Sequence, residues 1–92
     1  MIPKELKCHQ AKIAMDQLGP DPAAWPKYRQ QLKRWAVIHP DQDKRWRMPP
    51  KLVISVAAKN AGINLGNRRF GPDEAVPWLR SCGFEILDLD NP

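Results

Sequence analysis

The chain has 92 residues and a formal net charge of +5, from 15 Lys and Arg against 10 Asp and Glu. This length leaves room for one domain, residues 1–92, and a 42% share of hydrophobic residues argues against wholesale disorder. No apolar run approaches the about 20 residues of a membrane span, and the opening MIPKELKCHQ lacks the apolar stretch of a signal peptide. We therefore expect a cytoplasmic protein with no membrane contact.

Two helices are predicted in the N-terminal part of the chain. The first runs from about Pro3 to Leu18, where apolar positions 11, 14, 15 and 18 share one face before Gly19 stops the helix. The second runs from Pro26 to Ala36, with an apolar stripe at positions 28, 32, 35 and 36. The His-Pro pair at 39–40 closes it, because a residue before proline favours extended geometry, and 41–48 is a polar loop.

Residues 51–58 fit two kinds of secondary structure. Leu52, Ile54 and Val56 alternate as a half-buried strand would, whereas the run Ala57-Ala58 favours a helix. A helix from Pro50 to Ala61, stopped by Gly62, is the interpretation that we favour, and a strand remains the alternative.

The C-terminal third combines both kinds of element. Residues 63–70 are expected to form a short strand or a hairpin turning at Gly66-Asn67. A helix then begins at Gly71-Pro72 and ends at Gly83, with Pro77 either kinking or splitting it, and 84–89 is a strand. The expected fold is therefore α+β: three or four short helices (helical 1–61, mixed α/β 62–92), with a two- or three-stranded sheet toward the C-terminal half.

The inventory of catalytic and metal-binding residues is thin. The chain has two Cys, at positions 8 and 82, and two His, at positions 9 and 39, and none of the common nucleophile, phosphate-loop or zinc-helix motifs. Reduced thiols are the favoured state of the two cysteines, and a disulfide joining the ends of the chain is the alternative. We expect no enzyme, cofactor or metal site.

Positive charge is concentrated in the middle of the chain. No acid occurs from residue 44 to residue 71, whereas residues 72–92 hold Asp73, Glu74, Glu85, Asp88 and Asp90 against Arg80 alone. The basic middle must therefore pair with acids elsewhere in the chain or meet an anionic partner.

A cluster of basic and aromatic residues is the best candidate for a binding site. Arg guanidinium groups match phosphate oxygens, and a Trp between cations can stack on a base. The candidate contact residues are Lys33, Arg34, Lys44, Arg45, Trp46, Arg47, Lys51, Arg68 and Arg69.

Two functions fit this cluster. A small nucleic-acid-binding protein, contacting DNA or RNA phosphates, is narrowly favoured. The alternative is a protein-interaction module, such as a phage or mobile-element inhibitor or adaptor that docks on an acidic surface of a larger nucleoprotein or enzyme, because Trp and Arg are also enriched at protein interfaces.

Overall fold

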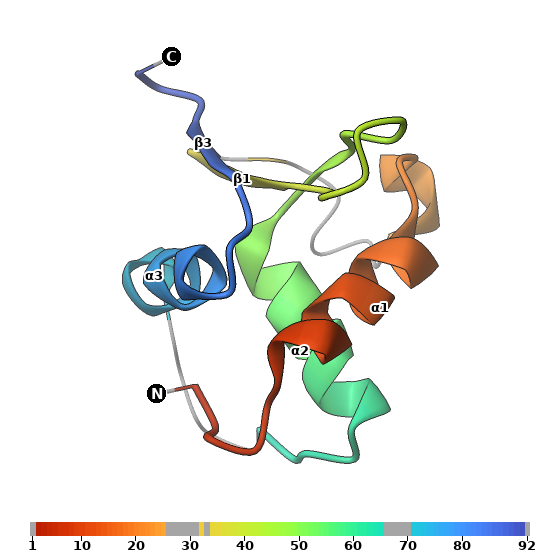
Figure 1. The fold of residues 1–92 in the computed structure, drawn as a ribbon, viewed down its shortest axis with the longest axis vertical. Helices are drawn as coiled ribbons and strands as arrows, with labels where there is room; N and C mark the ends of the chain where they lie inside the picture. The colour runs from red at the N-terminus through yellow and green to blue at the C-terminus, as the bar shows by residue number, and fades with distance from the viewer. Residues whose placement is uncertain (1, 26–31, 33, 66–70, 92) are drawn as a thin grey trace.

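The computed structural model describes residues 2–25, 32, 34–65 and 71–91 (Figure 1). The regular elements are α1 (Cys8–Leu18), a short 3-10 helix η1 (Pro22–Ala24), β1 (Trp35–Ile38), β2 (Arg47–Met48), α2 (Pro50–Asn60), α3 (Pro72–Ser81) and β3 (Ile86–Asp88). None of the helices among these residues is long and apolar enough to cross a membrane.

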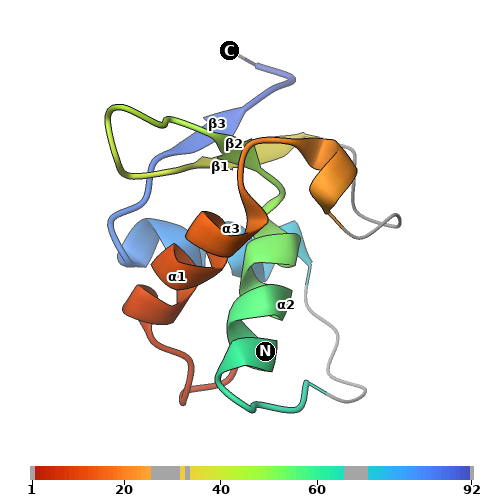
Figure 2. The same cartoon turned by 90° about the vertical axis from the view of Figure 1, so that its right-hand side faces the viewer.

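The three strands form one antiparallel sheet in the order β2-β1-β3, so the first strand in sequence is the central one. The three α-helices lie on one side of this sheet, as the two perpendicular views show (Figures 1 and 2). The expected fold class, α+β with three short helices and a small sheet, is confirmed.

Strand register decides which side chains face the helices. Val37 is opposite both Met48 and Ile86, and directly opposed residues share a face of the sheet. These three join the main core, together with apolar side chains of α1, α2 and α3. Because successive side chains alternate, Ala36 and Ile38 lie on the other face, where both are nevertheless buried.

The predicted helices are found close to their expected places. α1 buries the apolar face that the spacing indicated, although it begins at Cys8 rather than at Pro3. The ambiguous segment is helical, from Pro50 to Asn60, as we favoured. α3 begins at Pro72 and continues through Pro77 without a break. The strand predicted to begin at residue 63 is not found over 63–65, and the rest of the predicted strand or hairpin, with its turn at 66–67, lies outside the described residues.

The prediction that a second helix continues to Ala36 was wrong. Residues 26–31 and 33 lie outside the described part of the chain, but Trp35 and Ala36 belong to β1. The local pattern was outweighed by pairing with distant strands. The Ile38 amide donates to the Glu85 carbonyl, and the Leu89 amide donates to the Arg34 carbonyl.

The favoured reduced state of the cysteines was also wrong. Cys8, the first residue of α1, and Cys82, at the C-terminal end of α3, form a disulfide, with their Cα atoms 5.4 Å apart. Helix packing brings together residues that are 74 positions apart, which sequence spacing alone does not show. The bond consumes both thiols, so the intact protein offers no cysteine nucleophile.

Candidate functional site

The structure distributes the candidate contact residues over several elements. Arg34 directly precedes β1, residues 44–46 lie in the loop between β1 and β2, Arg47 is in β2 and Lys51 is in α2. Lys33, Arg68 and Arg69 lie outside the described residues. Within the described part, most of the candidate cations do not extend freely toward solvent.

Arg34 is held by a carboxylate of the C-terminal segment. Its Nε donates to Asp88 Oδ1 at 3.2 Å and its terminal nitrogen donates to Asp88 Oδ2 at 3.1 Å, a two-pronged contact across the β1–β3 pair. The hydrogen bond from Arg34 holds the pKa of Asp88 below its ordinary value. The guanidinium therefore already has the partner that it would otherwise offer to a phosphate.

Arg45 is paired in the same way. Its guanidinium donates to Glu85 Oε1 at 2.7 Å, and the two side chains are 47% and 48% exposed. Of the five acids in the C-terminal segment, Glu85 thus pairs with the basic middle and Asp88 pairs with Arg34, which precedes that stretch in the chain.

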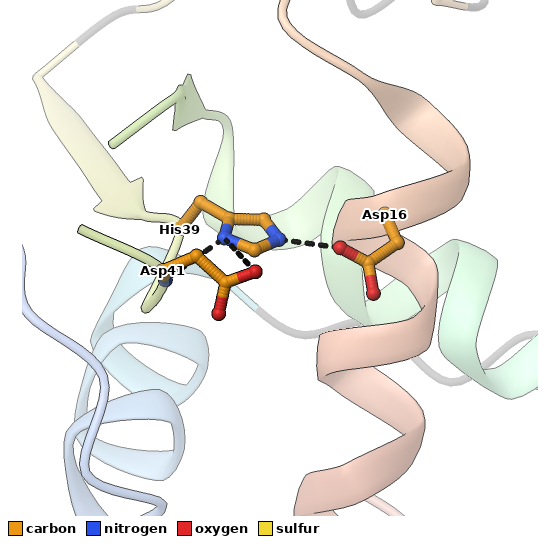
Figure 3. Close-up of side chains that lie close together, drawn as sticks. All are labelled: Asp16, His39 and Asp41. Atoms are coloured by element: carbon orange, nitrogen blue, oxygen red, sulfur yellow. Dashed lines mark hydrogen bonds and ion pairs between the residues drawn. The ribbon is translucent and has the colours of Figure 1, made fainter. Parts of the chain in front are cut away.

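Lys44 joins a polar network with Asp16, His39 and Asp41. Figure 3 draws the last three of these side chains. The His39 ring is fully buried. Its Nδ1 accepts the Asp41 backbone N–H at 3.1 Å, so the neutral ring carries its proton on Nε2 and donates it to Asp16 Oδ1 at 2.5 Å. This bond holds the pKa of Asp16 below its ordinary value, against a smaller opposing effect of desolvation.

The network contains one ligand atom from each of Asp16, His39 and Asp41 within 4.8 Å of one another, a spacing that a metal ion can use. However, both ring nitrogens of His39 already have hydrogen-bond partners. The Lys44 ammonium also lies 3.4 Å from Asp16 Oδ1 and 3.6 Å from Asp41 Oδ2, so it supplies the cation between the two carboxylates. We interpret the network as a set of polar contacts that hold the loop between β1 and β2 against α1.

Trp46 packs beside this polar network. Its ring meets the His39 ring edge to face at 4.9 Å, packs against the core and has the Lys44 ammonium 5.0 Å from its centre. A ring that is held in this way is less suited to stacking on a base than a fully exposed one. Trp35 is also half-buried, with the guanidinium groups of Arg34 and Arg80 at 4.7 and 5.7 Å from its centre.

Arg47 differs from Arg34 and Arg45. Its side chain is exposed, and among the described residues no acid lies within ion-pair distance of it. It borders an open groove of about 440 Å³, whose other described lining residues are Ile86, Leu87, Asp88, Leu89 and Asn91. The sequence analysis predicted a strand over 84–89 but no site there. The groove depends on the pairing of β1 with both β2 and β3, which the sequence does not show.

A scan against protein-family models found no match, and neither a search of curated proteins nor a search of solved structures found a similar chain.

Proposed function

We propose that this protein is a non-catalytic binding module whose partner is another protein. The observation that carries the proposal is the internal pairing of Arg34, Lys44 and Arg45 with carboxylates on other segments of the chain. These cations are electrically compensated, and apolar side chains that are only half-buried, Leu87 and Leu89, lie on the same strand pair.

Charge compensation weakens the case for nucleic acid as the main partner. Exposed ion pairs are worth only about 0–1 kcal/mol, so a phosphate can compete for the cation. Releasing the cation, however, leaves Glu85 or Asp88 beside the phosphate, and the resulting repulsion opposes binding. A phosphate-binding face normally holds cations without acids so close to them.

The exposed groups of the β1–β3 side fit a protein interface. Trp and Arg are the residues most enriched in interface hot spots, and Trp35 lies between the guanidinium groups of Arg34 and Arg80. Leu87 and Leu89 flank Asp88, the residue opposite Trp35, and are only half-buried, which leaves apolar surface on the other face of the same strand pair for a partner to cover. The disulfide favours an oxidising compartment over the cytoplasm that we expected.

Nucleic acid is the second candidate, and the net charge of +5 favours it. Ion pairing on part of the surface does not change that total, and the charge attracts any polyanion. Lys33, Arg68 and Arg69 belong to this candidate, and they lie outside the described residues.

Affinity capture with the full chain, performed without reductant so that the disulfide stays closed, separates the two candidates. The bait is exposed to an extract of the encoding organism with and without nuclease, and the eluate is measured for absorbance at 260 and 280 nm and for protein composition. We expect a defined protein to be retained equally in both arms. Nucleic acid in the eluate, with loss of bound protein after nuclease, would contradict the first proposal and support the second.

A further inference from the structure

The groove beside Arg47 is formed by strands that are not neighbours. β2 supplies Arg47 and β3 with the segment after it supplies residues 86–91, while β1 runs between them. Arg47 is opposite Ile38, and Leu87 is opposite Ala36, so these side chains share the sheet face that points away from the helices. Ala36 and Ile38 of β1 lie between them on this face but are buried, so the apolar lining of the groove comes from Ile86, Leu87 and Leu89.

The charge of the groove is unbalanced. Its one acidic lining residue among those described, Asp88, accepts hydrogen bonds from Nε and one terminal nitrogen of Arg34 and from the Asp90 backbone N–H. Arg47 has no such partner in the described part of the chain. The groove therefore combines a compensated carboxylate with an uncompensated guanidinium.

We propose that this groove binds an acidic segment of the partner protein, in which an Asp or Glu side chain lies next to an apolar side chain. The inference rests on the proposed function and names the site and the chemistry of the partner. Arg47 would hold the carboxylate with its fork of N–H donors, and Leu87 and Leu89 would cover the apolar neighbour. A nucleic-acid strand fits the same groove less well, because it repeats its charge at every phosphate while the groove offers one free cation among its described lining residues.

The test titrates the isotope-labelled full chain with a short capped peptide of Glu, Leu and Ser, followed by amide NMR shifts. We expect the shift changes to concentrate in β2 and residues 86–91. Replacing Glu by Gln in the peptide should weaken binding about tenfold, the effect of losing a charge-assisted hydrogen bond, and replacing Leu by Ser should also weaken it.

Two variants of the protein locate the site, and a third controls for charge. Arg47→Ala and Leu89→Ser should each raise the dissociation constant, by about tenfold for the arginine. Lys59→Ala removes the same charge at the far end of α2 and should leave affinity unchanged, and unchanged amide shifts outside the groove show that each variant is folded.

Three results would overturn the inference: no binding of the peptide, equal binding by Arg47→Ala and the unaltered protein, or equal binding of the Gln peptide. Failure of the inference is distinguishable from failure of the proposed function. If affinity capture retains the same partner protein on Arg47→Ala and on the unaltered chain, the partner is a protein but it docks elsewhere.

Discussion

Removing the Cys8–Cys82 disulfide should strongly destabilise the domain. The bond closes a loop of 74 residues, and the loop-entropy relation assigns about 4.5 kcal/mol to such a cross-link at 25 °C. A domain of this length has a total stability of about 5–14 kcal/mol, so the cross-link contributes a large share of it. Cys8 is exposed and Cys82 half-buried, so truncating them to Ala removes little packing and isolates the effect of the bond.

The assay is urea unfolding of the unaltered protein and of the Cys8→Ala, Cys82→Ala double variant, followed by circular dichroism. We expect the double variant to lose about 3–5 kcal/mol, and the unaltered protein in reductant to match it. A loss below about 1 kcal/mol would refute the reasoning. It would mean either that the cysteines are not bonded in solution or that the unfolded chain is already compact.

Three further predictions concern packing and charge. Leu79→Ala should cost about 2–5 kcal/mol in urea unfolding, because Leu79 is fully buried against the core; a cost near zero would mean that α3 does not pack as described. Asp16 has a lowered pKa in the folded state, so its contribution to stability is present above its unfolded pKa and is lost as pH falls through the folded value. Asp16→Asn should therefore flatten the acid limb of a plot of unfolding free energy against pH. An unchanged acid limb would contradict this. Glu85→Gln should lower stability by less than about 1 kcal/mol, since the pair with Arg45 is exposed. At low salt, where electrostatic binding is strongest, it should tighten binding to a duplex oligonucleotide by freeing that cation, and unchanged binding would show that the pair does not compensate Arg45.

Helices were predictable from the sequence because their signals are local. The apolar spacing of α1 and the proline starts of α2 and α3 act within a few residues. The strand β3 was also predictable, since 84–89 is a short segment rich in Phe, Ile and Leu that follows a glycine. The central strand β1 was not, because its residues follow a helical stripe and are held as a strand by β2 and β3, whose pairing depends on tertiary structure.

The candidate site was only partly accessible from sequence, for the same reason. The charge pattern identified Arg34, Lys44, Arg45 and Arg47, and it raised the option that the acidic C-terminal segment folds back. It did not show which cation would stay unpaired, because that depends on where Glu85 and Asp88 lie in the sheet. The Asp16–His39 contact joins residues 23 positions apart, and no spacing rule indicated it.

The central claim is that Arg34, Lys44 and Arg45 are neutralised by carboxylates of the same chain, and duplex binding measured across salt concentrations tests it most directly. We expect no saturable binding of a duplex oligonucleotide by the disulfide-closed protein at physiological salt. Saturable binding whose log–log salt slope approaches about −6, the value for seven engaged cations, would contradict the account.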